Sequence, residues 1–294
     1  MQYINLSKYP IDNLNSKKGQ ALVAKCKTKM STDGSLLLEG FIKRTAIEEM
    51  CAQVTGLATH RRLEISQPLA RDPFFDKTVL EQELPENHPA LFQVPQDVYA
   101  VASDLVPPTS MLRQVYDSNV VMNFIAAVNG QDRIYQYGDE FQALNVMYIK
   151  SGGNRAWHYD GSDYVVTLML QPSVEGGEFE YAPFIRGNKV GDENLPAVQK
   201  LFSGDWPTKQ TRCSAGALAV FNGRRSLHRV RTVYGNKNRI MSVLSYAKTK
   251  GEQGTPEKNV TLYGSRIANI YRRRGVVLNV VDGEPIVPSV VSKL

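Results

Sequence analysis

The stretch His158-Tyr-Asp-Gly-Ser-Asp-Tyr-Val-Val-Thr-Leu-Met-Leu170 joins two possible metal ligands to a hydrophobic run. His158 and Asp160 stand two residues apart, and on a strand the side chains of residues i and i+2 point to the same face. We therefore expect both side chains to reach one ion. The aliphatic and β-branched run at residues 164–170 predicts a buried strand. A His-x-Asp triplet alone arises by chance in many proteins, so the rest of the chain has to supply the context.

A second histidine and an arginine supply part of that context. His228 follows His158 by 70 residues, and Arg239 follows His228 by 11. Two imidazoles and one carboxylate can take three facial positions on an iron(II) ion, leaving three for a chelating co-substrate and dioxygen. An arginine binds a carboxylate through two parallel hydrogen bonds. The sequence therefore predicts a metal site at His158, Asp160 and His228, with Arg239 as the partner of an acidic co-substrate.

Short strands dominate the chain after residue 140. Runs of β-branched and aromatic residues are separated by turns such as Gly152-Gly153 and Gly176-Gly177. The expected strands are residues 144–149, 164–170, 178–181, 217–221, 230–234 and 240–246. Many short strands with glycine and proline turns are typical of a β-sandwich or barrel.

Helical patterns dominate residues 1–130 instead. Thr45 to Glu48 has the form of a capping box. Two apolar stripes at helical spacing are Ile47, Met50, Cys51 and Val54, and then Val121, Phe124, Ile125 and Val128. We expect both stripes to be core. At the other end of the chain, residues 259–274 are a candidate helix and residues 276–281 a candidate strand or packing tail.

The composition is that of an ordinary globular protein, with 42% hydrophobic and 22% charged residues. No apolar run approaches the ~20 residues that span a bilayer, and the first twenty residues lack the apolar segment of a secretory signal. The three cysteines, Cys26, Cys51 and Cys213, are widely spaced and odd in number, which favours reduced thiols over a disulfide framework or a zinc site. We expect a cytoplasmic protein with no membrane partner.

Positive charge is concentrated in one part of the chain. The formal net charge is +6, and residues 185–250 hold 13 Lys and Arg against 3 Asp and Glu. Three explanations are open: a solvated surface, a nucleic-acid partner and a local field that favours a dianionic co-substrate. No aromatic-rich basic motif accompanies the charge, so we do not expect a nucleic-acid partner.

The motifs around the ligands together resemble the iron(II)/2-oxoglutarate-dependent dioxygenase superfamily. Gly216-Ala-Leu-Ala-Val-Phe221 before His228 is similar to the family's G-x-L-x-x-F strand. Val230-Arg-Thr-Val233, Gly235 and Arg239 follow His228 and resemble the family's next strand, which bears the 2-oxoglutarate arginine. Gly176-Gly-Glu-Phe179 resembles the family's G-G-E-F turn. The motifs cover about 100 residues, roughly 145–246, in the expected order.

Within that superfamily the chain looks closest to the branch of radical halogenases and hydroxylases of free amino acids. The halogenases have glycine where this chain has Asp160, and the missing carboxylate leaves an iron position open for chloride. Because Asp160 fills that position, the resemblance points to hydroxylation of an unactivated C–H bond, with release of succinate and carbon dioxide. It implies iron(II), 2-oxoglutarate and dioxygen as cofactors, assisted by ascorbate, and a small substrate such as a free amino acid.

Further site residues are weaker candidates. Tyr148 and Thr167 are candidates to place hydroxyls near 2-oxoglutarate, and are equally ordinary strand residues. Acidic and basic candidates for the substrate's ammonium and carboxylate, each with a solvated-surface alternative, are Asp139, Glu140, Asp163, Arg224, Arg225 and Arg229. Trp157 and Trp206 either wall the pocket or pack, and Arg186 is expected in a structural ion pair.

The resemblance implies a mostly β fold with helices. We expect one domain over residues 1–294: a mostly helical N-terminal buttress at 1–130, a double-stranded β-helix (jelly roll) core at 131–250 and a C-terminal extension at 251–294. Rival functions are a peptidyl (prolyl-type) hydroxylase, a metal- and 2-oxoglutarate-binding sensor without turnover and, on the basic stretch alone, nucleic-acid demethylation. The sequence does not predict the oligomeric state.

Overall fold

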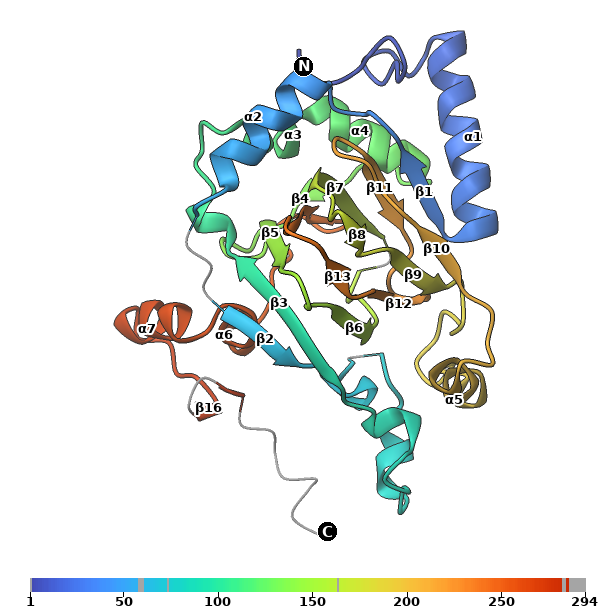
Figure 1. The fold of residues 1–294 in the computed structure, drawn as a ribbon, viewed down its shortest axis with the longest axis vertical. Coiled ribbons are helices and arrows are strands. Elements are labelled where there is room, and N and C mark those ends of the chain that lie inside the picture. The colour runs from blue at the N-terminus through green and yellow to red at the C-terminus, as the bar shows by residue number, and fades with distance from the viewer. Residues whose placement is uncertain (1, 58–60, 73, 163, 282–283, 286–294) are drawn as a thin grey trace.

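Two antiparallel β-sheets form the centre of the protein (Figure 1). The structure, a computed structural model, describes residues 2–57, 61–72, 74–162, 164–281 and 284–285. The larger sheet has the order β1 (Ser35–Leu38), β11 (Leu218–Phe221), β7 (Val165–Gln171), β14 (Arg239–Leu244), β5 (Leu144–Ile149), β3 (Pro95–Val101) and β2 (Arg61–Ile65). The smaller sheet has the order β10 (Lys209–Thr211), β9 (Phe179–Ala182), β12 (Leu227–Val230) and β6 (Arg155–His158).

The sheets face each other in the jelly-roll arrangement that the sequence predicts. Phe179 of the smaller sheet contacts Phe221 of the larger one, with ring centroids 4.8 Å apart. Short two-stranded pairs extend the sandwich: β8 (Glu175–Gly176) with β13 (Val233–Tyr234), β4 (Tyr135–Gln136) with β15 (Tyr246–Ala247), and β16 (Val280–Val281) with β17 (Glu284–Pro285). The mostly β fold class with added helices is therefore confirmed.

Strand alternation decides which side chains of the larger sheet reach the site. Ile240 pairs with Tyr148, and both belong to the core cluster between the sheet and the N-terminal helices. Arg239 and Met241 alternate with Ile240, so they point to the other face, toward the smaller sheet. The helices on the outer face are α1 (Lys17–Asp33), α2 (Arg44–Val54), α3 (Met111–Tyr116) and α4 (Asn119–Val128).

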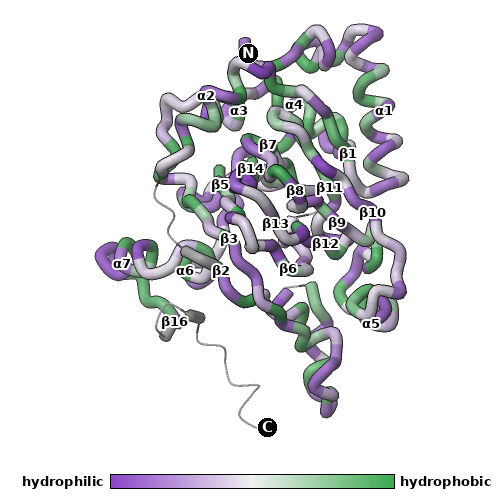
Figure 2. The backbone as a smooth tube through the Cα atoms, viewed as in Figure 1, coloured by the Kyte–Doolittle hydropathy of each residue, from purple (hydrophilic) through white to green (hydrophobic). Residues whose placement is uncertain are grey.

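Capping hydrogen bonds and backbone conformation set where helices such as α1 begin and end. Ser16 accepts a hydrogen bond from the Gly19 amide at the start of α1, and Gly34 ends that helix in the left-handed region at φ 67. Figure 2 shows hydrophobic and hydrophilic stretches alternating along α1, as expected for a helix with one face on the core. The expected capping box is wrong: α2 begins at Arg44 after Lys43, whose side chain makes no cap hydrogen bond.

The two predicted apolar stripes are confirmed as core, with Cys51 only partly buried. Their buried members are Ile47, Met50 and Val54 in α2 and Val121, Phe124, Ile125 and Val128 in α4. The reading of residues 1–130 as mostly helical is wrong in one respect, because β1, β2 and β3 from this part join the larger sheet. β3 shows the alternation of a strand with one buried face.

The predicted strands of the jelly roll are largely confirmed. Residues 144–149 match β5, and the other runs fall within two residues of β7, β9, β11 and β14. The run at 230–234 divides between the end of β12 and β13. The candidate helix at 259–274 is two helices, α6 (Pro256–Tyr263) and α7 (Ser265–Arg273), separated at Gly264, where φ is 73.

A separate hydrophobic cluster covers the outer face of the smaller sheet. It joins strand residues such as Trp157 and Leu227 to three of the 3₁₀ helices, η1 (Leu69–Arg71), η2 (Lys77–Glu81) and η3 (Pro89–Leu91), and to α5 (Leu195–Ser203). None of the helices in the described part of the chain is long and apolar enough to cross a membrane. The three cysteines are free thiols, as expected.

Candidate metal centre

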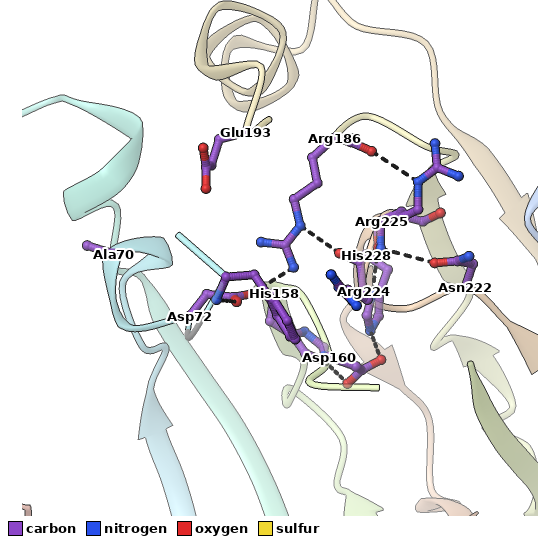
Figure 3. A network of polar contacts seen from close by, with 12 residues as sticks. Ala70, Asp72, His158, Asp160, Arg186, Glu193, Asn222, Arg224, Arg225 and His228 are labelled. Carbon is purple, nitrogen blue, oxygen red and sulfur yellow. Dashed lines mark hydrogen bonds and ion pairs between the residues drawn. The ribbon is translucent and has the colours of Figure 1, made fainter. Parts of the chain in front are cut away.

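His158, Asp160 and His228 come together at the end of the smaller sheet (Figure 3). β6 and β12 are neighbours, and their register places His158 directly opposite His228. One ligand atom from each of the three residues lies within 4.8 Å of the others. The distance from His228 Nε2 to Asp160 Oδ2 is 3.1 Å, and from His158 Nε2 to Asp160 Oδ1 it is 3.9 Å. The predicted constellation is therefore assembled in space.

Backbone carbonyls orient both imidazole rings. His158 Nδ1 lies 2.7 Å from the carbonyl oxygen of Ala156, and His228 Nδ1 lies 2.8 Å from that of Ser226. A carbonyl only accepts, so each Nδ1 carries the proton and donates it. Each Nε2 then presents a lone pair toward Asp160. This is the arrangement in which a second hydrogen bond fixes the tautomer of a metal-binding histidine.

Asp160 is placed by the neighbouring loop. The expectation that His158 and Asp160 share a strand face is wrong, because β6 ends at His158. The Asp160 amide donates to the carbonyl of Gly223 at 3.1 Å. A Cβ on Gly223 would lie 2.1 Å from Asp160 Oδ2, so only glycine leaves room for this carboxylate. A contact between two loops, and not strand alternation, brings the carboxylate to the histidines.

The ligand atoms fit a divalent cation. Asp160 Oδ2 is buried and has no hydrogen-bond partner among the described residues, although His228 Nε2 is close by. With Nδ1 protonated, Nε2 is an acceptor, and two acceptors at this distance repel each other unless a cation satisfies both. Two imidazole nitrogens and one carboxylate oxygen are a donor set for iron(II), and also for manganese, cobalt or nickel.

Electrostatics keep the ligands in the protonation states that a metal needs. Burial, with smaller contributions from His228 and Arg155, lowers the pKa of His158 well below its usual value, so this imidazole is neutral at pH 7. Burial alone would raise the pKa of Asp160, but His228, His158 and Arg155 hold it well below its usual range. Neutral imidazole and ionised carboxylate are the forms that bind metal.

Arg239 lies on the site side of the larger sheet, at the start of β14. It is 3% exposed, and its Nε donates to the Gly177 carbonyl at 3.0 Å. Its two terminal nitrogens contact only the sulfur of Met241, at 3.7 Å, and no carboxylate of the described residues lies within ion-pair distance. Burial lowers the pKa of Arg239 to about 10, which still leaves it charged at pH 7. The terminal nitrogens are thus free to bind a carboxylate.

The two hydroxyl candidates are separated by the sheet. Thr167 on β7 is buried and pairs with Val243, on the same face as Arg239. Tyr148 lies on the helix-facing side, where its hydroxyl donates to the carbonyl of Val54 at 2.5 Å. Tyr148 is therefore not brought to the site, because its position in β5 points it away from the smaller sheet.

The predicted substrate residues are not brought together. Glu140 is exposed and pairs with Arg274 after α7. Arg229 alternates with His228 on β12, so it points to the outer face, where its Nε donates to Glu180 at 2.8 Å. Both expectations therefore fail on geometry. Asp163 lies outside the described residues.

The other weaker candidates are mostly structural. Asp139 is buried and accepts from the backbone amides of Phe141 and Gln142. Trp157 is buried, and Trp206 packs at the edge of the cluster around α5. Neither aromatic ring walls the metal site, because Trp157 points to the outer face of β6.

A buried arginine not assigned to the site ties the metal loop to the 3₁₀ segment (Figure 3). Arg186 forms an ion pair with Asp72 at 3.0 Å, as expected of a structural role, and donates to the Arg224 carbonyl at 2.7 Å. Its guanidinium also stacks on the ring of Tyr159, 3.9 Å from the centroid, and Tyr159 lies between the ligands His158 and Asp160. Arg186 thus joins both ligand loops to η1.

Basic side chains surround the metal ligands. Arg224 lies over the Phe74 ring at 3.7 Å, and Arg225 over Phe184 at 4.7 Å. The Nζ of Lys258 reaches to 3.6 Å from where a Cβ on Gly161 would lie, beside Asp160. Arg155 donates to Gln96 at 2.9 Å and has no carboxylate within ion-pair distance in the described chain. Sequence spacing gave no signal for Arg155 or Lys258, because tertiary contacts alone bring them to the site.

Comparison with known proteins agrees with this geometry. The family model described as Halogenase D (HalD) matches residues 18–262 of the chain. No curated protein matches in sequence. Solved structures share the fold at low identity. One is an oxidoreductase of the 2OG-Fe(II) oxygenase family from Burkholderia pseudomallei, 13% identical, covering 78% of this chain and 92% of that chain, with a TM-score of 0.52.

Two further structures widen the range of relatives. AviO1 from Streptomyces viridochromogenes is 14% identical, covers 76% of this chain and 94% of that chain, and has a TM-score of 0.52. A prolyl hydroxylase from Trichoplax adhaerens, in complex with a hypoxia inducible factor peptide fragment, is 16% identical, with coverages of 81% and 97% and a TM-score of 0.50. The chain thus belongs to the Halogenase D family, and is an enzyme of the iron(II)/2-oxoglutarate oxygenase class.

Proposed function

We propose that the protein is an iron(II)- and 2-oxoglutarate-dependent hydroxylase of a small substrate, with free amino acids as the first class to test. The observation that carries the proposal is Asp160, a carboxylate that completes the ligand set with His158 and His228. When bound, iron(II) with 2-oxoglutarate and dioxygen supplies oxidation of an unactivated C–H bond and releases succinate and carbon dioxide. His158, Asp160 and His228 would hold the metal.

Arg239 is the residue proposed to hold the far carboxylate of 2-oxoglutarate. It is buried, charged and free of any carboxylate partner in the described chain. A planar guanidinium binds a carboxylate through two parallel hydrogen bonds. Thr167 on the same face is a second candidate contact for the co-substrate. Arg239 and Thr167 would orient 2-oxoglutarate and exclude water from its distal end.

Halogenation is the alternative raised by the family's name, and Asp160 argues against it. The halogenases that this chain resembles have glycine at this position. The structure gives Asp160 a dedicated place: Gly223 makes room for the carboxylate, and its backbone carbonyl accepts from the Asp160 amide at 3.1 Å. A carboxylate in this position occupies the coordination site that chloride would need.

A small substrate is favoured over a peptide by the 3₁₀ segment beside the ligands. Phe74 lies under Arg224, and Asp72 pairs with Arg186, so the described residues of this segment, 69–72 and 74–77, cover this side of the metal loops. The basic side chains Arg155, Arg224 and Lys258 support a substrate that carries a carboxylate. A prolyl-type hydroxylase remains the second candidate, because a prolyl hydroxylase is among the similar folds.

A succinate-release screen tests the proposal. Purified protein with iron(II), ascorbate, 2-oxoglutarate and chloride is offered each free amino acid, and a proline-containing peptide set in parallel. We expect substrate-dependent succinate with a product that has gained one oxygen atom. The Asp160→Gly variant should lose that product, because removal of a ligand weakens iron binding. A chlorinated product from the unaltered protein would contradict the hydroxylase assignment.

A further inference from the structure

A second cavity lies on the outer face of the smaller sheet, behind the metal centre. Its volume is about 280 Å³. β6 and β12 form its floor, Phe202 of α5 forms one wall and residues 92–95, which lead into β3, form another. Figure 1 shows α5 and the start of β3 on the same side of the molecule as β6. The size is at the lower end of small-molecule sites, which suits a ligand of about one ring.

The cavity is lined by positive charge and no acid. Arg155, Arg229 and Arg231 all contribute to the lining, and no carboxylate does. Glu180, outside the lining, accepts from the Nε of Arg229 at 2.8 Å and from the Thr208 hydroxyl at 2.9 Å, and it lies 3.9 Å from Arg231. The side chain of Arg231 is 46% exposed. Three guanidinium groups that line one cavity favour a carboxylate or a phosphate as its ligand.

Aromatic rings complete the walls. Phe92 and Phe202 are stacked with centroids 3.8 Å apart, and Arg229 lies 4.6 Å above the ring of Trp157. Arginine and aromatic surfaces together bind planar groups through stacking.

The floor of this cavity is the reverse side of the metal-binding strands. Trp157 and Arg229 face outward, while their neighbours His158 and His228 face the metal. The pairing of His228 with His158 and of Val230 with Arg155 leaves two β6 residues opposite one β12 residue, which is a β-bulge. Arg155 lies at this bulge. Its side chain lines the outer cavity, and its charge also lowers the pKa of Asp160 at the metal centre.

From this arrangement we propose that the outer cavity binds a small planar anion, namely an aromatic ring that carries a carboxylate or a phosphate. The guanidinium groups of Arg229 and Arg231 hold the anionic group, and the ring lies against Trp157 and Phe202. Because β6 and β12 carry both histidine ligands, an occupant of this cavity touches the strands that set the metal geometry. The site is separate from the co-substrate position at Arg239, which lies between the sheets.

Fluorescence of Trp157 tests the proposal without metal or turnover. Trp206 is the other tryptophan, so the full-length Trp206→Phe protein reports on Trp157 alone. It is titrated with phenyl phosphate, benzoate and inorganic phosphate. We expect a saturable change with either aryl anion, and at least about tenfold weaker binding of inorganic phosphate because it lacks the ring. Whichever aryl anion binds tighter identifies the natural anionic group as phosphate or carboxylate.

Matched variants locate the site. Arg231→Ala should weaken aryl-anion binding about tenfold, because one charge-assisted contact is lost. Arg212→Ala, which removes a half-exposed arginine on neighbouring β-structure outside the cavity, should leave binding unchanged. Saturating 2-oxoglutarate should also leave it unchanged. The proposal is overturned by the absence of a saturable signal, by equal effects of the two variants, by equal binding of inorganic phosphate or by competition with 2-oxoglutarate.

Discussion

Arg239 is a buried guanidinium that the protein leaves without a carboxylate. An unpaired charge in the interior destabilises the folded protein by several kcal/mol. A bound ligand that carries a carboxylate offsets this destabilisation by pairing with the guanidinium. The nearest groups, the Gly177 carbonyl and the Met241 sulfur, fix the plane of the guanidinium without neutralising it. The residue is thus oriented in advance for an acidic ligand.

Replacing Arg239 by lysine should weaken 2-oxoglutarate binding. Lysine keeps the charge but has no planar pair of donors, so we expect an apparent affinity about tenfold lower with metal binding retained. Calorimetric titration of 2-oxoglutarate into the manganese-loaded protein measures this. Arg231→Lys is the control, because Arg231 lies on the outer face. Equal affinities for the unaltered protein and Arg239→Lys would show that another group holds the co-substrate.

Spacing in the sequence was sufficient to single out His158, Asp160 and His228, which the structure brings together, and to suggest Arg239 as the co-substrate arginine. His158 and His228 lie on strands, whereas a contact between loops sets the direction of Asp160. Arg155, Arg186 and Lys258 could not be identified in this way, since only tertiary contacts bring them to the ligands. Tyr148 and Arg229 were misplaced because a one-residue change along a strand moves a side chain to the opposite face.

The β12 element and the turn before it show how backbone geometry makes the site. The turn at Asn222 and Gly223 approaches Asp160 so closely that a Cβ on Gly223 would meet its carboxylate. His228 then enters the smaller sheet opposite His158. The third ligand is therefore fixed by a loop against a loop, which no strand periodicity in the sequence reveals.

Gly223→Ala should disrupt metal binding without unfolding the protein. The added methyl group would overlap Asp160 Oδ2, so the carboxylate has to turn away from the histidines. We expect at least about tenfold weaker manganese binding by calorimetry, with little change in the thermal midpoint. Gly161→Ala is the matched control, because a Cβ there meets only the end of Lys258 at 3.6 Å. Unchanged metal affinity in Gly223→Ala would refute this account of Asp160.

Helices and strands were predicted correctly where the apolar pattern of the sequence is regular. They were missed where the strand is short or where a helical pattern surrounds it. The stripes of α2 and α4 and the run of β5 appear where the sequence places them. β3 was missed because it lies in a part of the chain dominated by helical patterns. The ligand-bearing strands β6 and β12 have four residues each, too few for alternation to stand out.

The contact between the 3₁₀ segment and the metal loops joins parts of the chain that are distant in sequence. Arg186 is 3% exposed, and its partner Asp72 is 10% exposed on the side chain. The same guanidinium stacks on the ring of Tyr159. This ion pair holds η1 and Asp72 beside the metal loops.

Arg186→Met should destabilise the protein by ~3 kcal/mol, because it leaves the Asp72 carboxylate buried and unpaired. Chemical denaturation of the metal-free protein measures the loss. Arg274→Met is the control: it breaks an ion pair with Glu140 in which both side chains are about half exposed, at 51% and 48%, so a loss under ~1 kcal/mol is expected. Equal losses of unfolding free energy in the two variants would show that the buried pair of Arg186 and Asp72 stabilises the fold no more than an exposed pair does.

His158, Asp160 and His228 are expected to hold iron(II) so that 2-oxoglutarate can chelate it. Chelation of iron(II) by a 2-keto acid gives a visible charge-transfer absorption, which anaerobic titration detects without any knowledge of the substrate. We predict that the absorption develops to one iron per chain in the unaltered protein and in His88→Ala. His158→Ala and His228→Ala should lose it while keeping the folded far-ultraviolet circular dichroism spectrum. No absorption in the unaltered protein, or the same absorption in His158→Ala, would contradict the account.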